Sequence, residues 1–176
     1  MMRNYSPVGE ITFPEGYFMR SYQQGDGVDW CECCIGGSLG IEETTEETFA
    51  EKMLKDETVN PANIFFLVSA SNEIAGTVTY QYSPKKDTGT IHMVGIKKEY
   101  QGLGLALPMN LYAVNKILED GKTQVDLKTD DWRLPAIKTY LNAGFKPIYS
   151  PQEPDMADRW VQVMKKLGII PCFRNS

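Results

Sequence analysis

The spacing of apolar and polar residues predicts an alternation of strands and helices along the chain. Short runs rich in β-branched and aromatic residues, bounded by Gly, Pro, Ser or Asn, are typical of strands. Longer runs with apolar residues three or four positions apart are typical of helices. The expected strands are 16–22, 64–69, 74–81, 90–96, 124–129, 145–149 and 159–164. The expected helices are 28–35, 44–55, one from Leu103 or Leu105 to about 118, and one from about 130 to 142.

This order, β-α-α-β-β-β-α-β-α-β-β, indicates the α/β (α+β) class. A hairpin with its turn at Ser71-Asn72-Glu73, followed by strand–helix–strand units, implies a mixed sheet with helices on both faces. Residues 1 to about 15, with Pro7 and Pro14, are expected to form a loose arm. Neither a linker nor a repeat divides the chain, so residues 1–176 are expected to form a single domain with its core in residues 16–166.

Several expected helix ends carry residues that favour a helix boundary. Ser, Thr, Asp and Asn side chains accept hydrogen bonds from the first free N–H groups, and Gly accepts the left-handed backbone of a helix end. Thr44-Thr45-Glu46-Glu47 fits a capping box at the start of the second helix. The other expected caps are Asp26 or Asp29, Asp130 or Asp131, Gly121 and Gly144.

The stretch Thr90–Ala106 combines a strand, a glycine-bearing turn and a helix start. The first N–H groups of a helix lack intrahelical partners and lie at the positive end of its dipole, so they bind phosphate oxygens when no side chain blocks the approach. Gly102 and Gly104 remove two such side chains. The turn lacks the Gly-Lys-Ser/Thr of a P-loop, and Leu107 stands where a dinucleotide fingerprint needs a third glycine.

Composition and charge narrow the class of partner. The 176 residues are 42% hydrophobic and 23% charged with a formal net charge of −5, as in a soluble globular protein. Nucleic acid is an unfavoured partner, because Lys and Arg are scattered and form no basic face. No apolar run is long enough to cross a membrane, and residues 1–10 lack the apolar core of a signal peptide. We therefore expect a cytoplasmic protein.

The cysteines suggest packing rather than a metal site. Cys31, Cys33 and Cys34 lie within eight residues of one another in WCECCIGG, and Cys172 is in the C-terminal tail. A closed zinc site needs four ligands, and His92 is the sole histidine, so no metal is expected. The cysteines are expected to pack one face of a helix. A redox role has no support beyond their spacing.

Two motifs resemble the GNAT superfamily of acetyl-CoA-dependent N-acyltransferases. Gln101-Gly102-Leu103-Gly104-Leu105-Ala106, preceded by the strand end Val94–Tyr100, resembles the family's Gln/Arg-x-x-Gly-x-Gly/Ala motif. The segment Thr129–Phe145 resembles its Asn-x-x-Ala-Ile-x-x-Tyr-x-x-x-Gly-Phe signature, with Arg133 in place of the asparagine. The resemblance covers residues 16–166 and implies a mostly antiparallel central sheet, acetyl-CoA as co-substrate and transfer of its acetyl group to an amine.

The resemblance also implies roles for individual residues. Residues 101–106 would hold the coenzyme A pyrophosphate, with Val94 and Ile96 bonding the pantetheine amides as an added strand would. Arg133 would contact the pantetheine arm, a phosphate or a substrate carboxylate. Gly95 suits a bulge whose free N–H polarises the thioester carbonyl. The implied cofactor-binding residues are Val94, Gly95, Ile96, Gln101, Gly102, Leu103, Gly104, Leu105, Ala106 and Arg133.

Tyr140 and His92 are the main candidates for proton transfer, and Glu73, Glu99, Asp131 or an ordered water chain are weaker candidates for the base. Tyr140 matches the position of the family's general acid, and a phenol with a pKa near ~10 stays protonated at neutral pH. The alternative is a core tyrosine with a satisfied hydroxyl. His92, two residues before Val94, has an unperturbed pKa suited to a base. The alternative is a partly buried strand histidine with a local hydrogen bond.

The amine acceptor, a small molecule or a peptide, is not identified by the sequence. Acidic residues from Asp26 to Glu51 favour a cationic amine or simply form solvated helix ends. Two other functions are consistent with the sequence: a non-catalytic acyl-CoA-binding or regulatory module on the same fold, and a thiol-based metal or redox protein. A homodimer is implied by resemblance alone.

Overall fold

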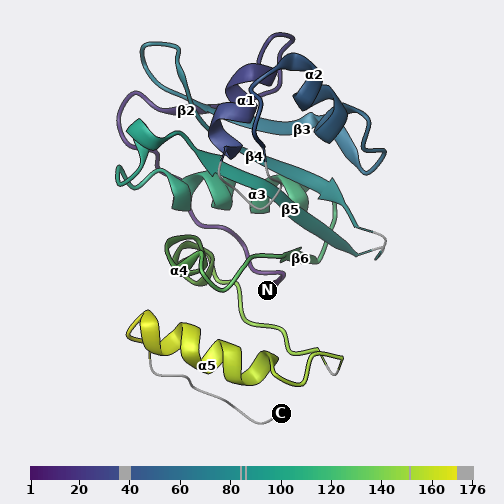
Figure 1. The fold of residues 1–176 in the computed structure, drawn as a ribbon, viewed down its shortest axis with the longest axis vertical. Helices are drawn as coiled ribbons and strands as arrows, with labels where there is room; N and C mark the ends of the chain where they lie inside the picture. The colour runs from purple at the N-terminus through teal and green to yellow at the C-terminus, as the bar shows by residue number, and fades with distance from the viewer. Residues whose placement is uncertain (36–40, 84, 86, 151, 170–176) are drawn as a thin grey trace.

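A computed structural model describes residues 1–35, 41–83, 85, 87–150 and 152–169 (Figure 1). Its strands are β1 (Met2–Asn4), β2 (Phe18–Ser21), β3 (Val59–Val68), β4 (Ile74–Tyr82), β5 (Thr88–Ile96) and β6 (Gln124–Leu127). Its α-helices are α1 (Gly27–Cys34), α2 (Glu46–Phe49), α3 (Ala106–Glu119), α4 (Leu134–Asn142) and α5 (Met156–Lys166). A π-helical segment, η1 (Ala50–Leu54), continues α2, and a 3₁₀ turn, η2 (Lys98–Tyr100), follows β5.

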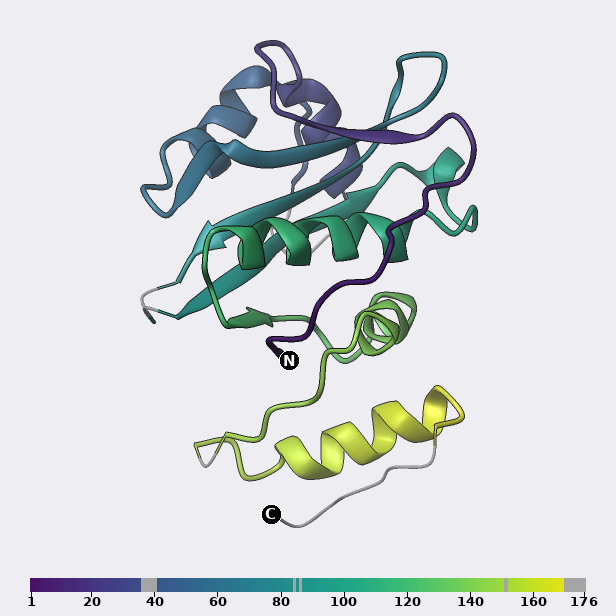
Figure 2. The ribbon, with the colours of Figure 1, turned by 180° about the vertical axis from the view of Figure 1, so that it is seen from behind.

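The described strands form one sheet in the order β1-β6-β5-β4-β3-β2. Every neighbouring pair is antiparallel except β5 and β6, which are parallel. Helix α3 crosses one face of the sheet, while α1 and α2 lie on the other (Figure 2). The predicted mixed, mostly antiparallel sheet with helices on both faces is therefore confirmed.

Strand β3 shows how both faces are buried. Ile64, Phe66 and Val68 pack with α1 and α2, whereas Phe65 and Leu67 pack with α3. Successive side chains of a strand point to opposite faces, so a strand covered on both sides reads as an unbroken apolar run. This is why the segment Ile64–Val68 contains no polar residue.

The expectation of a loose N-terminal arm is wrong for its first residues. Met2–Asn4 forms strand β1, which pairs antiparallel with β6 over Gln124–Asp126. The N–H of Met2 donates to the carbonyl of Lys146, and the N–H of Lys146 donates back to Met2. Strand β1 thus lies between β6 and the segment that follows α4. A three-residue strand whose partners are more than a hundred residues away leaves no local periodicity to detect.

The two strands expected at the C-terminal end are also wrong. Residues 145–149 contribute only an isolated bridge at Lys146, because Pro147 cannot donate to a ladder. Residues 159–164 lie inside helix α5. Trp160, Val163 and Met164 have the spacing of one helix face, and Val163 and Met164 are buried. Apolar and polar residues also alternate in this segment, which is why it resembles a strand.

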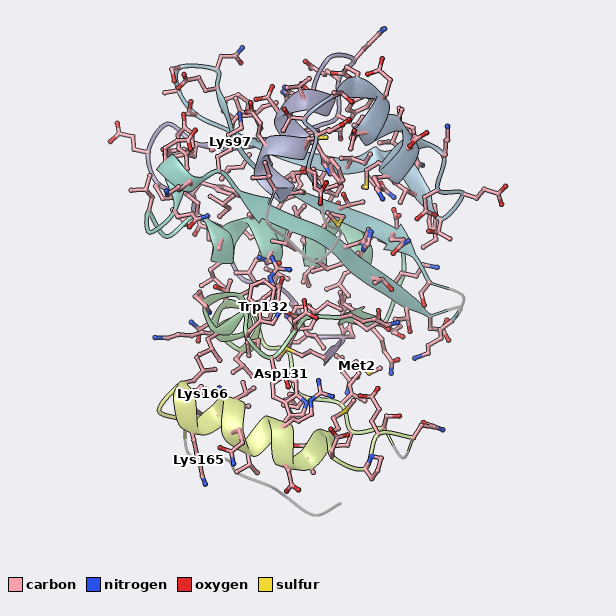
Figure 3. All side chains as sticks on the ribbon, viewed as in Figure 1. Met2, Lys97, Asp131, Trp132, Lys165 and Lys166 are labelled. Carbon is pink, nitrogen blue, oxygen red and sulfur yellow. The ribbon has the colours of Figure 1, made fainter. Side chains whose placement is uncertain are left out.

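Helix ends follow the expected chemistry at some positions and not at others. Thr45 caps α2, accepting a hydrogen bond from the N–H of Thr48 at 3.0 Å. Gly121 and Gly144 have φ of 76° and 86°, as expected of C-caps. The Asp130 or Asp131 cap is wrong: Arg133 occupies the N-cap of α4. Asp131 instead pairs with Arg159 of α5 at 2.7 Å (Figure 3).

Helix α1 is held against the end of β5 by an ion-pair cluster. Lys97, directly after β5, contacts Asp29 at 2.5 Å and Glu32 at 2.6 Å, both on α1 (Figure 3). Burial alone would lower the pKa of Lys97, but the hydrogen bonds to these two carboxylates outweigh it and raise the pKa above the usual value. Lys97 therefore stays charged and ties α1 to the sheet.

Glycine at position 95 lets α1 approach the sheet. A Cβ on Gly95 would lie 2.2 Å from the carbonyl oxygen of Cys33 and 2.7 Å from its carbonyl carbon. Both atoms are backbone and cannot rotate away, so the contact leaves no room for any side chain.

Among the described residues no helix is long and apolar enough to span a bilayer.

We expect Gly95→Ala to destabilise the protein by about 2 kcal/mol or more, because the methyl group forces α1 away from β5. Urea unfolding of the two proteins measures the difference. Gly9→Ala is the matched control, since a Cβ at Gly9 meets nothing within 4 Å. Equal stability of Gly95→Ala and Gly9→Ala would contradict the close contact.

Candidate active site

The candidate site begins where β5 and β6 separate. The parallel pairing runs from Thr88–Gln124 to Ile91–Leu127 and stops there. Strand β5 continues for five residues to Ile96, still paired with β4 on its other side. The backbone of β5 from His92 to Ile96 therefore has one edge free of strand pairing. We call this free edge, with the space beside it, the notch.

Strand β5 is irregular at Met93 and Val94, within the free edge that borders the notch. Thr77 pairs with Gly95 and Thr79 with His92, so Met93 and Val94 stand opposite the single residue Val78. Met93 has φ of 48°, the local distortion of a β-bulge. The sequence placed this bulge at Gly95, which is wrong. Gly95 is required instead by the approach of Cys33, and the bulge lies one to two residues earlier.

The bulge decides which face each side chain meets. Ile91 belongs to the cluster under α3, so His92 points to the opposite face, and Met93 packs there as well. Val94 and Ile96 return to the α3 face and pack against its cluster. Because of the bulge, the successive residues His92 and Met93 both point to the face covered by α1 and α2 instead of alternating.

The backbone groups of the free edge can be assigned from their neighbours. The N–H of Lys97 donates to Ala75 of β4, so by strand alternation the N–H of Gly95 also points toward β4. Val94 and Ile96 then direct their N–H and C=O groups into the notch. The side-chain amide of Gln101 confirms this direction, because it donates to the Ile96 carbonyl at 3.0 Å.

The turn after η2 contains several backbone N–H groups that have no partner in the described part of the chain. Gly102 and Gly104 have φ of 81° and 75°, and a Cβ on either glycine would meet nothing within 4 Å. No amide from Gly102 to Gly104 donates to another described residue, and no side chain caps α3 at Leu105. Leu105 is buried in the core and anchors the turn, whereas Leu103 is exposed. Open space, free amides and a helix N-terminus fit a phosphate group.

Tyr140 lies on α4 within the cluster of α3. Its side chain is 4% exposed, and its ring packs edge-on against Phe145. Burial raises the pKa of Tyr140, while the positive charge of Arg133 acts in the opposite direction. The hydroxyl makes no hydrogen bond to another described residue, so the interpretation as a satisfied core tyrosine is not supported. The phenol is a protonated donor at neutral pH.

His92 is half-buried on the other face of β5. Burial lowers the pKa of His92, and the nearby carboxylate of Asp56 raises it in part. A lowered pKa leaves the imidazole neutral near pH 7, the form that can accept a proton. The local hydrogen bond proposed as its structural role is not present among the described residues. Tyr140 and His92 therefore belong to opposite faces of the sheet, beside the strand that borders the notch.

Arg133 occupies the start of α4 next to an exposed aromatic ring. Its guanidinium lies 5.8 Å from the ring centre of Trp132, a cation–π distance (Figure 3). Its charge acts on the pKa of Tyr140 and also on that of Cys34 of α1. The charge of Arg133 therefore influences groups on both α4 and α1. A positive charge is thus present close to the candidate acid.

The cysteines of α1 are buried thiols. Burial raises the pKa of all three, that of Cys33 to about 12, so thiolates are not present at neutral pH. Cys172 lies outside the described residues. Within the described part of the chain, no group of three His, Cys, Asp or Glu is arranged to hold a metal. The three thiols pack against Trp30, Phe49 and Met53 as apolar side chains do.

Several acidic residues near α1 already have partners. Glu46 accepts hydrogen bonds from the N–H groups of Gly27 and Val28 at the start of α1. Asp26 pairs with Arg20 at 2.6 Å, and Asp29 pairs with Lys97. These three carboxylates stabilise helix ends and strand contacts within the protein, so they do not contribute free negative charge for a cationic amine.

Two residues that support the site were not found from the sequence. Lys97 fixes α1 on β5, and Arg3 donates through Nε to the carbonyl of Ala143 at the end of α4, 3.1 Å away. Arg3 therefore stabilises the C-terminus of the helix that carries Tyr140. The partners are 68 and 140 positions away in sequence, so no local signal marks either residue.

Comparison with known proteins agrees with this geometry. Residues 29–145 match the model of the acetyltransferase (GNAT) family. A mycothiol acetyltransferase from Thermomonospora curvata is 25% identical over 145 residues, which are 80% of this chain and 48% of that protein. The chain spans about half the length of the curated relatives it matches.

Solved structures show the same fold. A GCN5-related N-acetyltransferase from Sphaerobacter thermophilus superposes with a TM-score of 0.65 at 22% identity, over 81% of this chain and 45% of that chain. The ribosomal-protein-S18-alanine N-acetyltransferase from Escherichia coli superposes with a TM-score of 0.59 at 18% identity, over 76% and 79%. With a family model matching most of its length, the chain belongs to the acetyltransferase (GNAT) family of acetyl-CoA-dependent acyltransferases.

Proposed function

We propose that the protein transfers the acetyl group of acetyl-CoA directly to a primary amine in a ternary complex. The observation that carries this proposal is the continuous path from the free edge of β5 to the uncapped turn before α3. The free edge of β5 presents backbone N–H and C=O groups that can pair with the amides of the pantetheine arm. The turn before α3 presents backbone N–H groups that can bind the pyrophosphate to which that arm is attached.

The donor is held by backbone groups rather than by charged side chains. The N–H groups of Val94 and Ile96 and the carbonyl of Val94 pair with the pantetheine amides as a neighbouring strand would. The amides of residues 102–106 bind the pyrophosphate at the start of α3, since the N–H of Gln101 already donates to the carbonyl of Lys98. Gln101 is already engaged with Ile96, so it shapes the turn rather than contacting phosphate through its side chain.

Tyr140 supplies the proton that the leaving group needs. As the amine nitrogen forms its bond to the acetyl carbon, the thioester C–S bond breaks and leaves a thiolate. The Tyr140 hydroxyl, protonated and without a partner among the described residues, donates to that sulfur. Arg133, whose charge acts on the Tyr140 hydroxyl, stabilises the phenolate that forms.

His92 removes the proton from the attacking amine. It is neutral near pH 7 because burial lowers its pKa, and it lies on the face of β5 opposite Tyr140. An acceptor approaching from the α1 and α2 side meets His92, while the sulfur lies toward α4. The acid and the base then act on different atoms without exchanging their protons directly.

The acceptor is a small molecule or a peptide that carries a primary amine. Relatives named as mycothiol and ribosomal-protein-alanine acetyltransferases show that members of this fold differ widely in acceptor. Asp26, Asp29 and Glu46 near α1 are paired within the protein, so these three carboxylates are not free to bind a cationic amine.

Acetyl-CoA at 100 times its Kd should stabilise the folded protein by about 2.7 kcal/mol, coenzyme A should act similarly, and NADH should have no effect. Thermal unfolding measures the shift. Gly104→Ala should abolish it, because a methyl group enters the phosphate turn. Gly121→Ala is the matched control: it has nearly the same φ and equally open surroundings at the opposite end of α3. A full shift in Gly104→Ala would exclude the turn as the binding site.

Tyr140→Phe should lower kcat by about a hundredfold, since a general acid contributes on the order of 10² to 10⁴. Its Kd for acetyl-CoA should stay within a factor of about two, because no backbone contact changes. Tyr112→Phe on α3 controls for loss of a half-buried hydroxyl elsewhere. Steady-state release of free thiol gives kcat. Wild-type turnover by Tyr140→Phe would remove Tyr140 from the mechanism.

His92→Gln should remove the acidic limb of the kcat/KM profile. In the wild type this limb should fall below pH 6.5, because burial lowers the pKa of His92 and activity is lost once the ring is protonated. The same thiol-release assay across pH 5 to 9 checks this. An unmoved profile would assign the base to another group. Coenzyme binding without turnover for any amine would instead favour the non-catalytic acyl-CoA-binding module.

A further inference from the structure

A cavity lies away from the notch, between the N-terminal segment and the chain that follows α4. It has a volume of about 580 Å³ and is lined by residues 2–6, Gly144 and residues 146–149. Pockets that bind small molecules have volumes of roughly 300–1,000 Å³. None of its lining residues belongs to the notch, to the phosphate turn or to the candidate acid and base.

The charged residues of this cavity are both cations. Arg3 and Lys146 line it, and no Asp or Glu does. Neither cation forms an ion pair with a carboxylate of the described residues. A protein with a formal net charge of −5 thus has a locally positive cavity.

Arg3 is the more unusual of the two cations. Its side chain is only 8% exposed, yet its hydrogen-bond partners are two neutral carbonyls, those of Ala143 and Ser6. Nη1 has no partner among the described residues. A buried charge is normally paired, because desolvation is expensive, and each unsatisfied buried donor calls for an explanation. The carbonyls at the end of α4 balance only part of this charge.

Aromatic and aliphatic side chains also line this cavity. Tyr5 is 62% exposed and Tyr149 is 45% exposed, and Pro147 and Ile148 lie beside Tyr149 in the lining. Exposed apolar residues are usually scattered singly, and a cluster in a concave surface marks a binding site. Aromatic rings bind other planar groups by stacking, and they complement a neighbouring cation that fixes an anionic substituent.

We propose that this cavity binds a small planar molecule that carries one anionic group, the chemistry shared by aromatic carboxylates and nucleoside monophosphates. Lys146 at the rim pairs with the anion, and the buried charge of Arg3 adds to the attraction. Tyr5 and Tyr149 contact the planar part. Because the lining includes Gly144, which follows α4, and Arg3, which donates to the carbonyl of Ala143, the ligand lies next to the C-terminal end of the helix that carries Tyr140.

Isothermal titration calorimetry with adenosine 5′-monophosphate and with 4-hydroxybenzoate tests this, in the presence of coenzyme A so that the phosphate turn is occupied. We expect one of the two ligands to bind with one-to-one stoichiometry. Binding of the nucleotide alone identifies a nucleotide ligand, and binding of the benzoate alone identifies an aromatic acid. Adenosine and inorganic phosphate should each bind more weakly, since each offers only half of the required chemistry.

Variants locate the binding on the protein. Lys146→Glu should weaken the Kd by about tenfold or more, and Tyr5→Ala should weaken it as well. Lys138→Glu, an exposed lysine of α4 outside the cavity, is the matched control and should leave the Kd unchanged. Both positions are exposed, so the fold tolerates the changes. The proposal is overturned if neither ligand binds, if the lysine variants weaken binding equally, or if adenosine binds as well as its monophosphate.

Discussion

The divergence of β5 and β6 is the constraint on which the rest of the structure depends. Two parallel strands that pair over four residues and then separate leave backbone groups that no other strand satisfies. Helix α3 covers one face of β5 beside this gap, and α1 is held on the other by Gly95 and Lys97. Polar groups that a sheet would normally use internally become available to a ligand.

The central part of the fold is predictable because its signals are local. The run Ile64–Val68, the turn at Asn72 and the glycine turn before α3 each depend on residues within a few positions of one another. The ends of the chain are not predictable in this way. Strand β1 forms because Met2 pairs with Asp126 and Lys146, which lie far away in the sequence. The segment of α5 has a helical spacing at Trp160, Val163 and Met164 but also alternates like a strand, and only the burial of Val163 and Met164 in the structure separates the two interpretations.

The candidate site likewise contains some residues that local sequence signals predict and others that depend on tertiary contacts. The turn Gln101–Ala106 and the position of Tyr140 follow from motifs, and their chemistry can be argued from residue type. The bulge at Met93 could not, because it is set by how many residues fit opposite Val78 between two pairing registers. The residues that hold the site in place, Lys97 and Arg3, act across the sheet on α1 and on α4. The proposed reacting groups are recognised from sequence motifs, whereas the residues proposed to position them are recognised only from their contacts in the structure.

The pairing of β1 affects the order in which the strands can pair while the chain is being synthesised. Strands β2 to β5 are neighbours in sequence and can pair as soon as they emerge. Strand β1 emerges earlier, yet its partners in β6 lie 120 or more residues later, and the Met1 amine donates to the carbonyl of Leu127, 126 positions away. Until β6 and Lys146 have left the exit tunnel, this first segment has no native partner. The antiparallel meander is thus expected to form during synthesis, and the edge next to β6 to close afterwards.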